Sequence, residues 1–220
     1  MISIENVSKK FLQGEKEITV LDGLNFNLEV DGIIAIIGRS GSGKSTFLSL
    51  LAGLDKPTSG NVKINDENIS EMNEQELTAF RARNIGIVFQ NFHLVDNFTA
   101  LENVLLPLEV LKIPNPIVKA KEVLKLVGLE GREDHFPSQL SGGEKQRVAI
   151  ARAYVTSPKI ILADEPSGNL DPETGDKVMG VLFESAKKLK QTVLLVTHDR
   201  ELAKKCDHVF EIQNHKIEKL

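Results

Sequence analysis

The sequence predicts an α/β protein in which helices cover a largely parallel sheet. Three short runs of consecutive apolar residues carry this prediction, at 33–37, 160–163 and 193–196. A continuous apolar run suits a strand that is buried on both faces. Each run ends in a polar cluster and gives way to a helical pattern, as expected where strands and helices alternate along a chain.

Further strands are expected at both ends of the chain. Residues 2–7 have the composition of a strand. Residues 24–30 place an apolar side chain at every second position, which predicts an antiparallel strand with one buried face. Residues 209–217 predict a short hairpin that turns at Asn214 and His215.

The middle of the chain, from about residue 74 to 154, is predicted to be mostly helical. Helices are expected at 101–112 and 118–127, separated by two prolines, and a glycine is placed to end the second. We expect one domain over residues 1–220, with a helical subdomain at about 91–157 inserted into the α/β core.

Composition excludes several classes of protein. The 220 residues carry 27 basic and 31 acidic side chains, a net charge of −4, so no broad basic surface for nucleic acid is expected. One cysteine, Cys206, excludes an internal disulfide framework. No apolar run approaches the roughly 18 residues that a membrane-spanning helix needs, and the first residues lack the order of a signal peptide. We therefore expect a cytosolic protein that would serve a membrane process only through a partner.

A glycine-rich segment directly follows the first buried run. Residues 38–46 read Gly-Arg-Ser-Gly-Ser-Gly-Lys-Ser-Thr and fit the pattern G-x-x-x-x-G-K-[ST] of a phosphate-binding loop. This pattern requires a strand before it and a helix after it, and both are expected here. The apolar residues of that helix recur on one face: Phe47, Leu50, Leu51 and Leu54.

The residue types of this loop suit phosphate chemistry. Phosphate oxygens need several backbone N–H donors at close range, and glycines remove the Cβ atoms that would obstruct them. The helix start adds further N–H groups, Lys44 can reach the β- and γ-phosphates, and Ser45 can ligate Mg²⁺. A plain glycine-rich turn is the alternative. The residues expected to hold the phosphates are Gly38, Ser40, Gly41, Ser42, Gly43, Lys44, Ser45 and Thr46.

Two acids follow the second buried run. Asp164 and Glu165 come at the carboxyl end of the expected strand, where open α/β sheets bind ligands. Pro166 is expected to restrict Glu165 to an extended conformation. Asp164 is the candidate Mg²⁺ ligand, and Glu165 is the candidate base for an attacking water. Two solvated acids in a loop are the alternative.

The segment 140–144, Leu-Ser-Gly-Gly-Glu, opens another expected helix. Ser141 and Glu144 have the spacing of a capping box, which is a purely structural explanation. Glycine in a helix costs about 1 kcal/mol relative to alanine, however, so Gly142 and Gly143 are a costly choice for a first turn. Bare glycines at a helix start make sense where an anion must come very close.

With this segment between the phosphate loop and the acid pair, the chain resembles the ATP-binding-cassette (ABC) family along its whole length. Gln90 matches the glutamine of the Q-loop in that family, and residues 167–171 match its D-loop. His198 matches the switch histidine. Phe11 stands where the family places an aromatic residue that stacks on adenine; tyrosine is commoner there, so a hydroxyl contact is lost.

Each match also has a simpler structural explanation. Gln90 could be a strand-end hydrogen-bonding residue, His198 could cap a helix, and Phe11 could be an ordinary core residue. Asp171, which precedes a proline, is a good N-cap for a helix that runs to about Leu189. The joint order and spacing of these residues favour the family resemblance.

The resemblance implies a P-loop NTPase fold with a RecA-like core, an antiparallel β subdomain and an inserted α-helical subdomain. It implies a Mg²⁺-dependent ATPase that forms a homodimer with ATP. Each ATP would lie between the phosphate loop of one chain and Ser141, Gly142 and Gly143 of the other. The implied catalytic residues are Glu165, His198, Gln90 and Lys44. The implied ligands of Mg²⁺ are Ser45, Gln90 and Asp164, and Phe11 and Asp171 complete the nucleotide contacts.

The resemblance also implies a separate membrane permease, with this chain at the cytoplasmic face of the inner membrane as a peripheral subunit. Residues 92–104 are unusually apolar for a loop, which predicts a groove for the permease. A small core for the helical lobe is the alternative. The candidate groove residues are Phe92, Leu94, Val95 and Phe98.

One branch of the family resembles this chain in residues 98–104, 53–60 and 167–171. That branch contains LolD-type lipoprotein-releasing, MacB-type efflux and FtsE-type cell-division cassettes. His93 and the short chain favour the LolD type, with the other two as alternatives. ABC-type ATPases that serve nucleic acid are disfavoured, because chromosome-maintenance heads carry a long heptad region and translation factors carry two cassettes.

Overall fold

The computed structural model describes residues 2–14, 16–29 and 31–220. The chain divides into two compact units: Met1–Arg81 together with Leu194–Leu220, and Ala82–Val193. The strand β8 (Thr192–Thr197) begins in the second unit and continues into the first.

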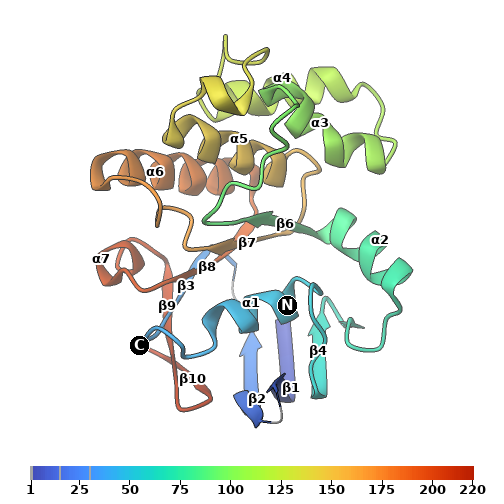
Figure 1. Ribbon diagram of the computed structural model, residues 1–220, viewed down its shortest axis with the longest axis vertical. Coiled ribbons are helices and arrows are strands. Elements are labelled where there is room, and N and C mark those ends of the chain that lie inside the picture. The colour runs from blue at the N-terminus through green and yellow to red at the C-terminus, as the bar shows by residue number, and fades with distance from the viewer. Residues whose placement is uncertain (1, 15, 30) are drawn as a thin grey trace. The chain divides into compact units, whose positions relative to one another are not determined.

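The first unit contains a four-stranded antiparallel sheet in the order β2-β1-β4-β5 (Figure 1). In β2, the side chains of Leu24, Phe26 and Leu28 are buried and alternate with exposed ones, which confirms the expected antiparallel strand. Val30, expected to end that strand, lies outside the described residues. The strands of this sheet are β1 (Ile2–Gln13), β2 (Lys16–Leu28), β4 (Ser59–Ile64) and β5 (Glu67–Asn68).

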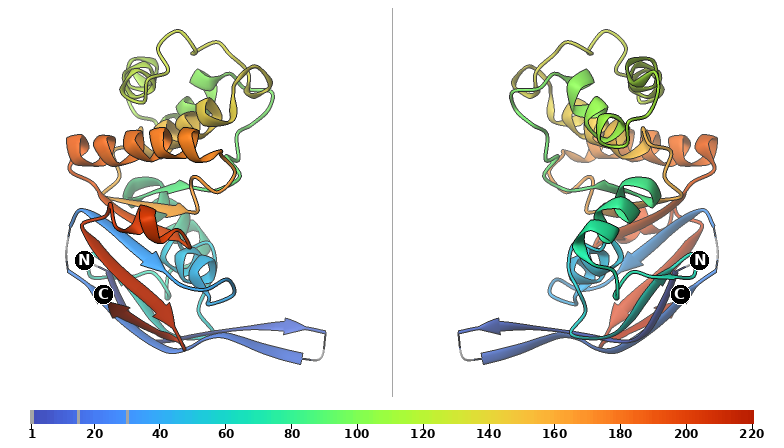
Figure 2. Two further views of the ribbon diagram at one scale, coloured as in Figure 1. Left: turned by 90° about the vertical axis from the view of Figure 1, so that its left-hand side faces the viewer. Right: turned by 90° about the vertical axis from the view of Figure 1, so that its right-hand side faces the viewer.

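Strands β1 and β2 extend well past the predicted ranges 2–7 and 24–30. Their two-stranded ribbon extends away from the rest of the first unit (Figure 2). The register between them shifts at three places between Ile4 and Lys10. Such shifts break the two-residue period on which a sequence-based strand prediction depends.

The remaining strands of the first unit follow the order β10-β9-β3-β8. Strand β3 (Ile33–Ile37) is buried along its whole length, as the apolar run predicts. It pairs in parallel with β9 (His208–Gln213), which forms a hairpin with β10 (Lys216–Lys219). Asn214 and His215 have φ angles of 49° and 61°, so the expected hairpin turns on two left-handed residues.

Helix α1 (Lys44–Leu51) follows the loop after β3. The side chains of Phe47, Leu50 and Leu51 are buried, as expected. The expectation for Leu54 was wrong: this side chain is 50% exposed and lies beyond the helix. The chain leaves the helix through Gly53, which has a φ of 60° that glycine adopts without strain.

The second unit pairs β6 (Ile85–Val88) in parallel with β7 (Ile160–Asp164) and is otherwise mostly helical (Figure 1). The two helices expected at 101–112 and 118–127 form within two residues of those bounds. The helices are α2 (Glu74–Asn84), which leads into this unit, α3 (Ala100–Val110), α4 (Pro116–Leu126), α5 (Gly142–Tyr154) and α6 (Pro172–Leu189).

Helix α6 begins after Asp171 and ends at Leu189, as predicted. The buried Tyr154 hydroxyl, on α5, donates to the Leu182 carbonyl on α6 at 2.9 Å, which ties the two helices together. Among the described residues, no helix is both long and apolar enough to cross a membrane.

Candidate functional site

The glycine-rich loop between β3 and α1 closes around Lys44. The side chain is buried, and its Nζ donates to the carbonyl oxygens of Gly38 at 2.9 Å and Arg39 at 3.0 Å. A lysine ammonium has three N–H donors. Two of them hold the ammonium group at the loop, and the third can donate to a phosphate oxygen.

Two glycines of the loop are required by backbone geometry. Gly41 and Gly43 have φ angles of 78° and 92°, a region that other residues adopt only with strain. Gly43 is the N-cap of α1 and offers no side chain to cap the first-turn N–H groups. Those N–H groups therefore remain suited to an anion.

Gly38 is required for packing. A Cβ at this position would lie 2.7 Å from the carbonyl oxygen of Ile212 and 2.7 Å from Ser42 Oγ. Close packing therefore explains the glycine at this position as well as the expected approach of a phosphate does. Ser42 Oγ is itself buried and has no hydrogen-bond partner within the described part of the chain. An unpaired buried hydroxyl in a loop of this kind fits a ligand that supplies the missing partner.

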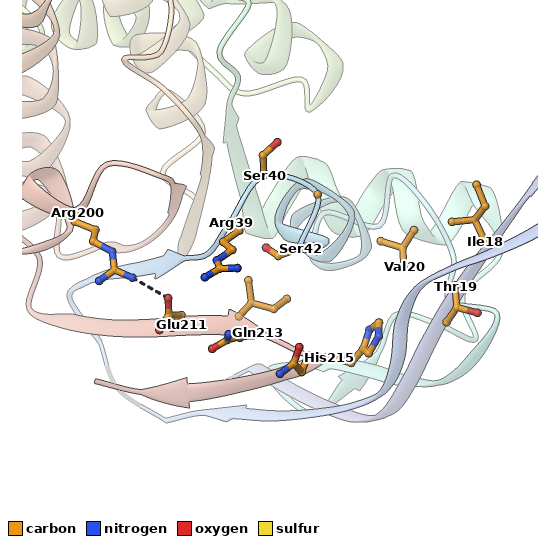
Figure 3. A pocket seen from close by; sticks show the side chains of 13 residues that line it. Ile18, Thr19, Val20, Arg39, Ser40, Ser42, Arg200, Glu211, Gln213 and His215 are labelled. Carbon is orange, nitrogen blue, oxygen red and sulfur yellow. Dashed lines mark hydrogen bonds and ion pairs between the residues drawn. The ribbon is translucent and has the colours of Figure 1, made fainter.

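The loop opens onto a cleft of about 540 Å³ within the first unit (Figure 3). Its walls are the loop, residues 18–20 of β2, and the β9–β10 hairpin. Arg200 Nη2 and Glu211 Oε1 form an ion pair of 3.0 Å at one end. A cleft of this size is within the range of small-molecule sites.

Phe11 and His198 also belong to the first unit. Phe11 is 41% exposed and lies opposite Ile18, which lines the cleft, so its interpretation as an ordinary core residue was wrong. The Lys9 ammonium lies 4.8 Å from the centre of the Phe11 ring. His198 is exposed just after β8. It is not the N-cap of α7 (Arg200–Ala203), because Asp199 accepts the first-turn N–H groups.

In the second unit, Asp164 ends β7 and Glu165 begins a turn. The expectation of an extended Glu165 was wrong, since its φ is 46°. Its carbonyl oxygen accepts the Gly168 N–H at 2.9 Å, and the next carbonyl, of Pro166, accepts from Gln146 Nε2 at 2.7 Å. These bonds hold the turn directly after β7. They also hold Glu165 in a left-handed conformation that costs about 1–3 kcal/mol.

Gln90 follows β6 and is exposed. Its Nε2 donates to Asn169 Oδ1 at 3.0 Å, so its structural role as a hydrogen-bonding residue is present. Asp171 also has its alternative role: it caps α6 by accepting the Thr174 N–H at 3.0 Å, and that bond lowers the pKa of its carboxyl group.

Helix α5 begins with the predicted capping box. Ser141 Oγ accepts the Glu144 N–H at 3.3 Å, and Glu144 Oε2 accepts the Ser141 N–H at 2.8 Å. Gly143 is buried, and a Cβ there would lie 2.6 Å from Thr174 Cγ2. The glycine at 143 therefore has a packing reason that needs no ligand, whereas Gly142 is exposed at the helix start.

The Glu144 carboxylate is held strongly in its charged form. The Ser141 N–H, then Arg132 and the Ser141 hydroxyl, lower its pKa from an ordinary 4.5 to about 2. Arg132 Nε donates to the carboxylate at 2.9 Å. The negative charge beside the first turn of α5 is thus partly neutralised by Arg132.

This pKa shift predicts a loss of stability in acid. Because the folded-state pKa lies below the ordinary value, the contribution of Glu144 is complete above about pH 4.5 and fades as the pH falls toward 2. Glu144→Gln keeps the reciprocal cap without the charge. In urea unfolding from pH 6 to pH 2, we expect the wild type to lose about 1–3 kcal/mol relative to this variant. Parallel curves would contradict the assignment.

The predicted site residues fall in both units. The first unit holds Phe11, the phosphate loop and His198. The second holds Gln90, Asp164, Glu165, Ser141, Gly142, Gly143 and Asp171. Sequence reasoning missed Arg132 and missed Asn169 as a partner of Gln90. It predicted the hairpin at 209–217 but not that this hairpin forms one wall of the cleft.

Comparison with known proteins identifies the family. The profile of the family "ABC transporter" matches residues 21–168. The chain belongs to the ABC transporter family. It is an ATP-binding ATPase domain of that family with the expected P-loop NTPase fold, which confirms the sequence-based resemblance.

Several ABC relatives are similar along the whole chain. The lipoprotein-releasing system ATP-binding protein LolD of Treponema denticola is 41% identical over 100% of this chain and 98% of the relative. Methionine import ATP-binding protein MetN 2 of Oceanobacillus iheyensis is 44% identical over 99% of this chain, but over only 64% of its own length. The ATP-binding cassette MJ0796, in a dimeric post-hydrolysis state bound to ADP and Pi, is 41% identical with a TM-score of 0.90. The match covers 100% of this chain and 99% of the MJ0796 chain.

Proposed function

We propose that two copies of this ABC ATPase enclose Mg²⁺-bound ATP between them and so power a separate permease. The similarity to the MJ0796 cassette, whose dimer is bound to ADP and Pi, is the observation that carries this proposal. Such an interface would be isologous, because each copy gives the same two surfaces.

Within one copy, the phosphate loop and Lys44 would bind the β- and γ-phosphates, and Phe11 would stack on adenine. The bonds that hold Lys44 at the loop and the exposure of the Phe11 ring support these roles. Glu165 would accept a proton from the attacking water, while His198 holds the γ-phosphate and orients that water.

The side chains proposed for Mg²⁺ fit a hard cation. Ser45, Gln90 and Asp164 offer a hydroxyl, an amide and a carboxylate oxygen, and Mg²⁺ is usually held by one or two carboxylates together with substrate phosphates. When bound, the ion neutralises charge that develops on the phosphate oxygens.

The partner copy would complete the phosphate site through the start of its α5. Exposed Gly142 would present first-turn N–H groups to the γ-phosphate, and Asp171 would lie in the same interface. The Ser141 hydroxyl donates to Glu144 Oε2 at 2.8 Å and would turn this O–H toward the γ-phosphate. Arg132 offsets the Glu144 charge that would otherwise repel a phosphate there. Loss of the γ-phosphate would weaken these contacts and open the dimer.

We further propose that the chain is a peripheral subunit at the cytoplasmic face of the membrane, in a LolD-like lipoprotein-releasing system. LolD relatives that are 41–43% identical over nearly the whole length of both chains support this assignment. Residues 91–157 would form the subdomain that meets the permease. A neighbouring gene for a protein with four membrane spans and a large extracytoplasmic domain would support the LolD or MacB type. A neighbouring membrane protein with a small extracytoplasmic part would favour the FtsE type.

The permease groove is best tested at Val95. Phe92, Leu94 and Phe98 are half-buried, whereas Val95 is 39% exposed and its backbone is held by Asn103. We expect Val95→Asp to lower co-sedimentation with membranes containing the cognate permease by at least about fivefold, since burying a charge in an apolar contact is costly. ATPase activity of the isolated protein should be unchanged.

Val110→Asp is the matched control, because Val110 is also exposed, at 68%, and lies at the end of α3. This variant should sediment as the wild type does. If both variants sediment normally, the permease does not dock at Val95.

A further inference from the structure

Three amide side chains from two distant loops form a hydrogen-bonded cluster in the second unit. Asn169 Nδ2 donates to the Gln90 carbonyl oxygen at 3.1 Å and to Asn91 Oδ1 at 2.7 Å. Gln90 Nε2 donates back to Asn169 Oδ1 at 3.0 Å. Asn169 therefore contacts both the backbone and the side chain of Gln90.

This pattern fixes which end of the Gln90 amide faces Asn169. Both N–H bonds of Asn169 are already directed at the Gln90 carbonyl oxygen and Asn91 Oδ1, so only its Oδ1 can face the side-chain amide of Gln90. An oxygen there requires the Nε2 end of Gln90 as its partner. The Oε1 end of Gln90 is then the end that is left to meet a cation, which binds oxygen and never an N–H group.

The loop that carries Asn169 is shaped to admit Gln90. A Cβ on Gly168 would lie 2.7 Å from Gln90 Nε2 and 3.0 Å from its Cδ, so a larger residue would displace the amide. The Gly168 N–H is bonded to the Glu165 carbonyl at 2.9 Å, and the Leu170 N–H to the Ser167 carbonyl at 3.0 Å. The position of Asn169 is thus set by the turn that begins at Glu165.

We propose that Asn169 is a positioning residue that orients Gln90 so that its Oε1 is presented to the Mg²⁺ ion of the bound nucleotide. This inference rests on the proposed function, in which Gln90 is a Mg²⁺ ligand. Outer-shell partners of metal ligands commonly act in this way, by fixing the orientation of the ligand.

The test is the gain in nucleotide affinity that Mg²⁺ provides. Trinitrophenyl-ATP is titrated against the full chain, once in EDTA and once with Mg²⁺, and the ratio of the two dissociation constants is compared between variants. We expect Asn169→Ala to keep the affinity in EDTA within about twofold and to lower the Mg²⁺ gain by about three- to tenfold, the effect of one hydrogen bond. Asn91→Ala removes one acceptor of Asn169 but leaves the Gln90 carbonyl oxygen, which still holds the Asn169 amide in the same orientation, so this variant should retain the wild-type gain.

A double-mutant cycle separates positioning from a general structural effect. In a Gln90→Ala background, Asn169→Ala should cause no further loss of the Mg²⁺ gain, because the residue it orients is gone. Asn169, Asn91 and Gln90 are all exposed, so the variants should fold, and thermal melting checks this.

The failures are distinguishable. If the wild type binds no nucleotide, the proposed function is wrong. If the wild type shows a Mg²⁺ gain that Asn169→Ala leaves intact, or if Asn169→Ala weakens binding equally in EDTA and in Mg²⁺, the positioning role is wrong. An additive loss in the Gln90→Ala background would also overturn it.

Discussion

Replacing Glu165 with glutamine is expected to stop ATP turnover and to trap a dimer that forms only with ATP. Glutamine has nearly the same size but cannot accept a proton from water, and loss of a general base costs about 10²- to 10⁴-fold in rate. The phosphate loop and Lys44 are unchanged, so ATP should still bind. Phosphate release measures the turnover, and light scattering after gel filtration measures the mass with ATP, ADP or no nucleotide.

A second substitution tests whether that dimer uses the start of α5. Ser141 is exposed, and losing its cap of α5 should cost only about 0.5–2 kcal/mol. Ser141→Arg should therefore fold yet obstruct the contact with the nucleotide of the other copy. The Glu165→Gln/Ser141→Arg protein should bind ATP and remain a monomer. The matched control places arginine at Ser138, an exposed residue just before this segment, and should dimerise. A Glu165→Gln protein that stays monomeric at saturating Mg-ATP would contradict the mechanism.

The largest loss of nucleotide affinity is expected from Lys44→Ala. This change removes the ammonium from the loop, and one charged hydrogen bond to phosphate is worth about 1.5–3 kcal/mol. Affinity for ATP should therefore fall about 10- to 100-fold, and hydrolysis should become undetectable. Isothermal titration calorimetry and phosphate release measure the two effects.

Stability must be measured in the same variant, because Lys44 also has a structural role. Its removal leaves the carbonyl groups of Gly38 and Arg39 without their donor, a cost of about 1–3 kcal/mol. Lys63→Ala is the matched control, since Lys63 is a half-buried lysine outside the loop that pairs with Glu5. If Lys44→Ala bound ATP as tightly as this control does, the loop would not be the phosphate site.

Much of the fold could be predicted because local chemistry and tertiary structure agree. The apolar runs became β3, β7 and β8, since strands buried on both faces need no alternation. The starts of α5 and α6 were predicted because Ser141 and Asp171 cap them through bonds within three residues. In these elements, local sequence preference and tertiary packing favour the same secondary structure.

Elsewhere the deciding forces are not local. The register shifts of β1 against β2 hide the length of both strands. Glu165 adopts a positive φ because its carbonyl accepts the Gly168 N–H and the Pro166 carbonyl accepts from Gln146. These two bonds outweigh the preference for an extended conformation that the following proline imposes. Leu54 is exposed because the preceding glycine ends the helix early.

The site residues were predictable where a motif carries them and hidden where only tertiary contacts do. The phosphate loop and the Ser141 segment have recognisable patterns. Asn169 meets Gln90 across 79 positions of the chain, and Arg132 meets Glu144 across 12. The reason for glycine at 143, a close approach of Thr174, likewise becomes visible only in the packed structure.

The most direct measurement is a structure of the Glu165→Gln protein with Mg-ATP. We expect two copies, with each γ-phosphate contacted by Lys44 of one copy and by the Ser141–Gly142 start of α5 of the other. If α5 of the second copy points away from the γ-phosphate in every assembly observed, the two copies do not share the nucleotide.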